Sequence, residues 1–254
     1  MMSFRYLFAA ILSFSGVICG YVEPGQCLES KINDANAAPS LPSSSSESKD
    51  QSIRSLRSED TRRLNELDQN LKKNSLQMNV AKTLTLGLLG QTRKSNGTLK
   101  ISKGQLRLEL TGGEHSLLVI NEKAFWAVSF PDADFNDSPV KVVTSSRDLD
   151  RDVKQNLLSV LIKGKMLEYF LPAGVIDLEG DLVSYFMQPK KTTGDFQRAQ
   201  VTLNRKSSQL VGLKYWDARG NEVQFDFSEV LKVQSMDKSL FQYSPPSNAE
   251  IIKL

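Results

Sequence analysis

The side chains best suited to acid–base or nucleophilic chemistry are few and scattered. The only histidine, His115, follows Gly112, Gly113 and Glu114 in a stretch typical of a turn. No motif that holds zinc, nucleotide phosphates or a nucleophilic serine is present. Because a catalytic base needs a group to activate, a lone turn histidine does not indicate catalysis. The sequence therefore predicts a protein that is not an enzyme and that uses no cofactor.

A short acidic stretch is the other candidate for chemistry. Residues 132–137 contain Asp132, Asp134 and Asp137 directly after Pro131. A calcium-binding loop requires a central glycine and a terminal glutamate, and this stretch has neither. It is predicted to be an exposed loop, so no metal site is expected.

Composition excludes one class of partner. The 254 residues include 32 Lys and Arg and 29 Asp and Glu, which gives a formal net charge of +3. No basic stripe with interleaved aromatic residues accompanies this weak bias, so a nucleic acid is not an expected partner. An apolar content of 40% is ordinary for a globular chain and is enough for a sizeable core.

The first twenty residues are typical of a signal peptide, because one positive charge precedes a short, interrupted apolar run. The run is barely long enough to span a membrane, which disfavours a transmembrane anchor. Cleavage after Gly20 would leave Cys27 as the only cysteine, so no internal disulfide is expected. The alternative is a lipid attached to Cys19, which would anchor the chain.

Residues 21–57 form a predicted linker and residues 58–73 a predicted helix. The linker is rich in Ser and Pro and nearly free of large apolar side chains, so it cannot bury enough surface to fold. In the helix, Leu64, Leu67 and Leu71 recur at spacings of three and four and form a narrow apolar stripe. Such a helix is expected to pack on another element.

From residue 77 onward, apolar and polar residues alternate with the period of two that half-buried β-strands show. Gly and Asn at the joints supply the positive φ angles of tight hairpins. Sequential strands with short turns predict an antiparallel meander and a mainly β fold. The predicted strands are 77–89, 97–101, 106–110, 116–121, 124–130, 140–144, 182–188, 196–204, 210–217 and 222–230.

A second helix is predicted within residues 150–165. Val153, Leu157 and Leu161 form one stripe, and further apolar residues widen it beyond what one-sided packing on a sheet needs. Two interpretations are open. The helix is either a lid over an apolar pocket inside a curved sheet or an ordinary buried core helix.

The hairpin at residues 116–131 has a distinctive order of residue types. A serine and three apolar residues precede a polar turn with a lysine, then an apolar residue and a tryptophan, and a proline closes it. This order resembles the central hairpin of the outer-membrane lipoprotein carrier (LolA) family. Residues 97–110 and 239–252 resemble other parts of that family, in the same order along the chain. The residues that carry the resemblance are Ser116, Leu117, Leu118, Val119, Asn121, Glu122, Lys123, Phe125, Trp126, Pro131, Phe241, Tyr243, Pro245 and Pro246.

The resemblance implies an incomplete antiparallel barrel of about ten or eleven strands, with short helices forming a lid over an apolar cavity. It implies that residues 58–254 are a monomeric periplasmic carrier, or chaperone, that takes the acyl chains of lipoproteins from the inner to the outer membrane. The implied partners are acylated lipoproteins, an ATP-driven lipoprotein-releasing transporter of the inner membrane and a lipoprotein receptor of the outer membrane. The residues expected to line the cavity are Leu99, Ile101, Leu106, Leu108, Leu110, Leu118, Ile120, Trp126 and Val128.

The resemblance also implies a lid that contains Val153, Leu157 and Leu161, and a latch at Lys103. In the family an arginine at that turn hydrogen-bonds to the lid, whereas lysine keeps the charge but lacks the planar guanidinium. Which face of the sheet is concave stays open. The alternative function is an anchored outer-membrane lipoprotein receptor, or a lipid-sensing regulator, with the same fold.

Overall fold

The structure is a computed structural model that describes residues 52–131, 138–145, 157–191 and 196–253. The predicted signal peptide, nearly all of the predicted linker and both cysteines lie outside the described residues. So do the acidic stretch at 132–137 and the predicted lid residue Val153. The expectations for these segments stay predictions.

The strands form one twelve-stranded sheet. Its order is β12-β6-β5-β4-β3-β2-β1-β11-β10-β9-β8-β7. Neighbouring strands are antiparallel apart from β12 and β6, which run parallel. The bounds are β1 Ser75–Leu86, β2 Gln91–Ser102, β3 Gln105–Gly112, β4 Ser116–Ile120, β5 Phe125–Ser129, β6 Lys141–Ser145, β7 Phe170–Asp177, β8 Leu182–Pro189, β9 Phe196–Asn204, β10 Leu210–Asp217, β11 Glu222–Val233 and β12 Glu250–Lys253.

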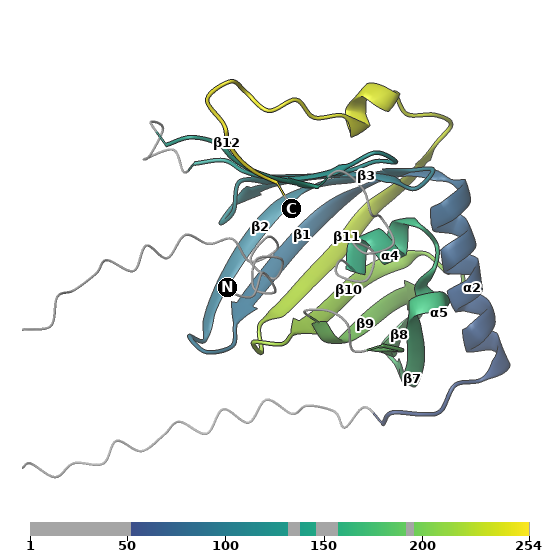
Figure 1. Cartoon of the computed structure of the whole chain (residues 1–254). Coiled ribbons are helices and arrows are strands. Elements are labelled where there is room, and N and C mark those ends of the chain that lie inside the picture. Colours follow the sequence, from purple (N-terminus) through teal and green to yellow (C-terminus); the bar gives the residue numbers. More distant parts are fainter. Residues whose placement is uncertain (1–51, 132–137, 146–156, 192–195, 254) are drawn as a thin grey trace, which may run out of the picture.

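The sheet curls strongly around the helices. In Figure 1, β2, β1 and β11 form the back of a hollow, with β3 to β6 on one side and β10 to β7 on the other. The two edge strands, β12 and β7, do not pair with each other in the part of the chain that the structure describes. The barrel is therefore incomplete, and the predicted fold class is confirmed.

All ten predicted strands are present, and two further strands, β7 and β12, were not predicted. Pro172 and Gly174 interrupt the apolar pattern of β7, and the strand tolerates this proline because it lies at the edge of the sheet. β12 is only four residues long and pairs with β6 along the other edge. The C-terminal residues 250–253 are thus part of the sheet.

The helices occupy the hollow and one end of it. Helix α2 (Ser58–Lys73) has the predicted bounds, and its three stripe leucines are buried in the core. Helix α4 (Leu157–Ile162) lies within the predicted second helix, and α5 (Met166–Tyr169) follows it. In Figure 1, α4 and α5 lie inside the curl of the sheet, beside α2. A short 3₁₀ helix, η3 (Lys238–Phe241), begins the C-terminal segment.

The two faces of the sheet carry separate apolar clusters. The main cluster lies on the concave face and combines residues of β1 to β11 with those of α2, α4 and α5. A smaller cluster on the outer face of β4, β5 and β6 consists of Leu117, Val119, Val128 and Val142. Tyr243 and Ala249 of the C-terminal segment pack against this smaller cluster. The concave face is therefore the one that holds the core.

Candidate functional site

The predicted leucines and isoleucines of β2, β3 and β4 form the concave wall. Strand pairing places Leu99 opposite Leu108, and Leu108 opposite Leu118, so the three side chains lie in one row across the sheet. Neighbouring rows continue the same face at the spacing of two residues that a strand imposes. The predicted residues in this wall are Leu99, Ile101, Leu106, Leu108, Leu110, Leu118 and Ile120, all of which are buried in the main cluster.

Trp126 lies on the outer face of β5, and the prediction that it points into the cavity is wrong. It pairs with Val119 and packs against the outer cluster. Val128, also predicted to face the cavity, belongs to that outer cluster and only borders the small cavity, so this prediction is wrong as well. The alternate residues of β5, Phe125 and Ala127, face the concave side instead. The physical reason is that the C-terminal segment covers this part of the outer face and needs apolar partners there.

Two cavities lie along the concave face. A cavity of about 300 Å³ lies between α2 and the ends of β1, β10 and β11. Its apolar lining comes from Leu67, Leu71, Leu76, Met78, Leu210 and Val230. A smaller one, of about 40 Å³, lies among Leu108, Leu110, Leu118, Ala127, Val143 and Ile252, with Val128 and Leu117 also at its border. The larger cavity reaches the lower end of the size range typical of small-molecule pockets.

One end of the small cavity is polar. The ammonium of Lys82, on the concave face of β1, forms an ion pair with the Glu114 carboxylate, which also accepts a 2.6 Å hydrogen bond from the Ser116 hydroxyl. Only 2% of Lys82 is exposed. Sequence reasoning missed this residue, although a lysine on the apolar phase of β1, between Val80 and Leu84, was a visible signal.

The buried hydroxyl of Tyr215 lies close enough to this polar end for the charge of Glu114 to act on it. The Tyr215 hydroxyl of β10 is buried without a hydrogen-bond partner among the described residues. Burial raises the pKa of Tyr215, and the negative charges of Asp217 and Glu114 raise it further. The hydroxyl therefore stays protonated and could donate a hydrogen bond to a bound polar group.

Helices α4 and α5 dock on α2 through one carboxylate. Asp68 of α2 is buried, and its oxygens accept hydrogen bonds from the main-chain N–H groups of Met166 at 3.1 Å and Leu167 at 3.4 Å. Gly164 has φ +58° and lies so close to α2 that an added Cβ would be 2.3 Å from the Asp68 carbonyl oxygen. The burial of Asp68 raises the pKa of its carboxyl, although the two N–H groups partly offset this.

The predicted lid residues are placed unevenly. Leu157 and Leu161 of α4 are buried in the main cluster, so α4 has the packing of a core helix in this conformation. Lys103 lies in the exposed two-residue turn between β2 and β3, where it and Gly104 both have positive φ. No hydrogen bond or ion pair joins Lys103 to another described residue, so the structure does not bring it to α4.

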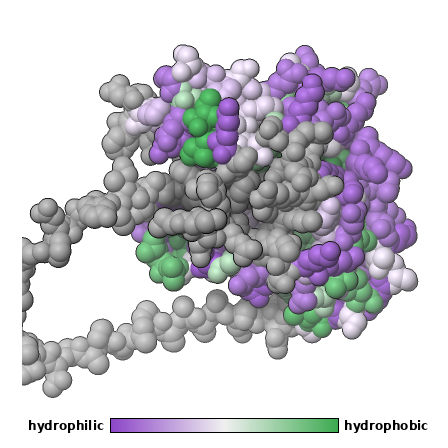
Figure 2. Space-filling view, in the orientation of Figure 1, coloured by the Kyte–Doolittle hydropathy of each residue, from purple (hydrophilic) through white to green (hydrophobic). Residues whose placement is uncertain are grey.

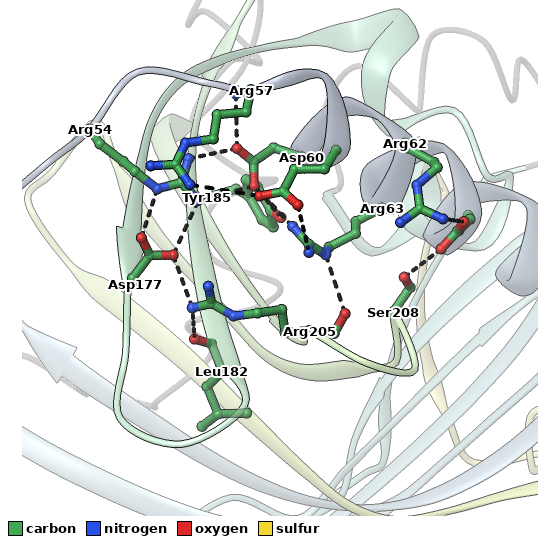
Figure 3. A network of polar contacts seen from close by, with 12 residues as sticks. Arg54, Arg57, Asp60, Arg62, Arg63, Asp177, Leu182, Tyr185, Arg205 and Ser208 are labelled. Atoms are coloured by element: carbon green, nitrogen blue, oxygen red, sulfur yellow. Dashed lines mark hydrogen bonds and ion pairs between the residues drawn. The ribbon is translucent and has the colours of Figure 1, made fainter.

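A network of charged groups instead fixes the start of α2 to the edge of the sheet. Figure 3 shows the Arg54 guanidinium between two carboxylates, that of Asp60 at 2.6 Å and that of Asp177 of β7 at 2.7 Å. The Tyr185 hydroxyl donates to Asp60 at 3.1 Å. Main-chain hydrogen bonds also join Arg54 to Val175 in both directions.

These contacts shift the acidity of both carboxylates. Burial tends to raise the pKa of the Asp60 carboxyl, but hydrogen bonds from Arg54, the Arg57 N–H and Tyr185 outweigh burial and hold the pKa below its usual range. The hydrogen bond from Arg54 is the main reason that the pKa of Asp177 is lowered. Burial raises the pKa of Tyr185 to about 12. Both aspartates are therefore ionised at neutral pH.

The remaining candidate for chemistry, His115, stacks on Phe130 with ring centroids 4.4 Å apart. Within residues 52–131, 138–145, 157–191 and 196–253, no group of three or more His, Cys, Asp and Glu residues could hold a metal ion. A membrane-spanning helix is likewise not found among the described helices, none of which is both long and apolar enough.

Comparison with known proteins gives a family and several distant structural relatives. A LolA superfamily protein from Nitrosomonas europaea is 12% identical, with a TM-score of 0.38, and the match covers 72% of this chain and 97% of that one. A putative outer membrane lipoprotein-sorting protein domain from Vibrio parahaemolyticus is 10% identical, with a TM-score of 0.36 and coverages of 70% and 95%. The Pseudomonas aeruginosa MucA/MucB complex is 13% identical, with a TM-score of 0.38, and the match covers 77% of this chain and 63% of that one.

No curated protein sequence is significantly similar to the chain. The sequence matches the family described as outer membrane lipoprotein carrier protein LolA over residues 72–244, which run from the end of α2 through all strands but β12. This span contains the concave wall, α4, α5 and most of the lining of both cavities. The chain therefore belongs to the outer membrane lipoprotein carrier protein LolA family.

Proposed function

We propose that this chain is a periplasmic carrier that binds the acyl chains of lipoproteins on its concave face and moves them from the inner to the outer membrane. The observation that carries the proposal is the continuous apolar concave face of an open, curled sheet, with a cavity of about 300 Å³ between α2 and the ends of β1, β10 and β11. The protein acts by binding and catalyses no reaction.

The energetics explain why such a carrier is needed. Each CH₂ group removed from water contributes about 0.8 kcal/mol, so one long acyl chain exposed to water costs on the order of ten kcal/mol. A lipoprotein with several chains cannot cross an aqueous compartment unshielded. Release requires that part of this energy be offset, since a carrier that retained all of it would not let its cargo go.

In the empty protein α4 fills the hollow of the sheet, and moving it aside would cost free energy that opposes ligand binding. Leu157 and Leu161 of α4 are buried against the wall, so a bulky ligand has to displace them or make the wall repack. The contacts between Asp68 and the α4–α5 segment would then act as the point about which the helices move. In this proposal, α4 is both the core helix of the empty state and the lid of the loaded state.

The proposed partners are the cargo and the proteins that supply and accept it at the two membranes. Acylated lipoproteins are the cargo, an ATP-driven transporter of the inner membrane supplies them and a receptor of the outer membrane accepts them. The test is to purify the chain from its native periplasm and identify co-purifying lipidated proteins by mass spectrometry. Acylated proteins bound to a soluble, unlipidated chain are the expected result.

A cavity-filling substitution makes the test specific. Met78→Trp extends a side chain into the 300 Å³ cavity, whereas Gln77→Trp places the same group on the opposite phase of β1. The first variant should lose most of its co-purifying lipoprotein and the second should retain it, with equal thermal unfolding temperatures. Equal cargo on both variants would contradict the proposal. A lipid attached to Cys19 of the chain itself would indicate the anchored receptor instead.

A further inference from the structure

The turn between β1 and β2 presents two leucines to solvent. Leu88 is 90% exposed and Leu89 is 61% exposed, and Leu88 is the most exposed large apolar side chain of the described residues. Figure 2 shows a green apolar patch at the lower left, where this hairpin ends, beside the purple surface of the neighbouring turn. Because the fold buries neither leucine, their apolar surface is available to a partner.

The turn holds these leucines outward through its own hydrogen bonds. The N–H groups of Leu89 and Gly90 donate to the Leu86 carbonyl at 3.2 and 2.8 Å, and Gly90 has φ +61°. The Gly87 N–H donates to the Asn221 side chain at 3.1 Å, which joins the hairpin to the turn between β10 and β11. The hairpin turn is thus braced against the neighbouring turn, which holds both leucines away from the sheet. The turn at residues 87–90, together with Arg93 and Lys94, is called the rim below.

Positive charge flanks the leucines. Arg93 and Lys94 follow on β2, and neither forms an ion pair with another described residue. The carboxylates of the neighbouring turn do not balance both cations: Glu222 pairs with Lys214 at 2.8 Å, and Asp217, which is buried and accepts hydrogen bonds within its own turn, is a single negative charge. The rim therefore combines an apolar tip with a surplus of cationic side chains.

We propose that this rim, the turn at residues 87–90 with Arg93 and Lys94, docks on the surface of an anionic lipid bilayer. Leu88 and Leu89 enter the apolar edge of the bilayer while the two cations contact lipid phosphates. The charge surplus favours a lipid surface over an apolar protein groove, which would bind the leucines but gain nothing from the cations. The inference does not depend on the proposed carrier function.

The position of the rim gives docking a direction. Lys82 lies four residues before Leu86 on β1, and the β3–β4 loop with Glu114 lies beside the same half of β2. The polar end of the small cavity is thus at the end of the hollow nearest the rim. Docking at residues 87–90 brings this end toward the bilayer and leaves α2 away from it.

The test is the binding of the full chain to lipid vesicles, measured by co-sedimentation. Vesicles of phosphatidylglycerol mixed with phosphatidylcholine are compared with vesicles of phosphatidylcholine alone. Because burial of one leucine side chain strengthens partitioning about tenfold or more, Leu88→Gln with Leu89→Gln should weaken binding to the anionic vesicles about a hundredfold. Arg93→Gln with Lys94→Gln should weaken it about tenfold or more, and only on anionic vesicles.

Leu231→Gln is the matched control. Leu231 is 56% exposed but lies at the opposite end of β11, where it pairs with Gln77, so its loss should change binding less than twofold. All variants share the same N-terminal residues, whose contribution to binding is therefore common to them. The inference is overturned if the leucine pair and Leu231 behave alike, or if the chain binds native membranes but no protein-free vesicles, which would indicate a protein receptor.

Discussion

The ion pair between Lys82 and Glu114 gives the sharpest test of the concave wall. The Lys82 side chain is 1% exposed and that of Glu114 is 16% exposed, so the pair lies in an apolar environment with little access to water. Lys82→Met keeps most of the side-chain volume but leaves the carboxylate without its cation. Removing one partner of a buried pair typically costs 3–5 kcal/mol.

We expect a loss of about 3 kcal/mol, the lower end of that range, because Glu114 keeps some exposure and the hydrogen bond from Ser116. With a urea m value of about 2 kcal/mol/M, the unfolding midpoint falls by about 1.5 M. The double variant Lys82→Met with Glu114→Gln should recover most of the loss, since no unpaired charge remains.

Lys214→Met is the control, because the pair of Lys214 with Glu222 is about 30% exposed on both sides and should contribute less than about 1 kcal/mol. Urea unfolding followed by circular dichroism measures the three variants and the unsubstituted chain. If Lys82→Met lowers the free energy of unfolding no more than Lys214→Met does, the surroundings of Lys82 are not the apolar, water-poor environment described above. If the double variant is as unstable as the single one, the loss comes from packing and not from the unpaired charge.

Two further predictions concern polar groups around the core. Tyr215→Phe removes a buried hydroxyl that has no partner among the described residues, so it should raise the free energy of unfolding by about 1 kcal/mol. Tyr185→Phe removes the hydrogen bond to Asp60, so it should lower the free energy of unfolding by about 1 kcal/mol. A large destabilisation by Tyr215→Phe would instead indicate a bound partner. Because Arg54 lowers the folded-state pKa of Asp177 and Asp60, their contribution to stability is present above the unfolded pKa of about 4 and is lost as pH falls through the lowered values. Arg54→Gln should therefore flatten the loss of stability in acid, measured by urea unfolding between about pH 5 and 2, and the exposed Arg57→Gln should leave it unchanged.

The strands of the concave wall were predictable because their signal is local. Leu106, Leu108 and Leu110 alternate with polar residues, and Leu99 and Ile101 do the same on the neighbouring β2, whereas β4 is continuously apolar over residues 117–120. A one-residue slip would expose the whole set, so the pattern fixes the register as well as the strand. The presence of α2 was equally clear, since its leucine spacing has the period of a helix, and Asn74 directly follows its last residue.

The direction in which the β4–β5 hairpin faces was not predictable from its own residues. Phe125 and Trp126 are both large and apolar, and either could face the core. The outcome depends on the C-terminal segment, which returns more than a hundred residues later to cover the outer face at Tyr243. A short edge strand such as β12 depends on the same long-range contact. Contacts of this kind leave little trace in a window of neighbouring residues.

The open sheet has two edge strands, β7 and β12, and neither offers a long regular edge to another strand. Arg54 bonds its main chain to Val175 on β7, and residues 250–253 pair with β6 at the other side. Unpaired strand edges invite the addition of strands from other molecules, which leads to aggregation. An incomplete barrel is especially exposed to this hazard, because closure is not available to remove its edges. Pro172 and the Arg54 bridge interrupt the edge of β7, and β12 offers only four residues, so both edges disfavour the addition of a strand from another molecule.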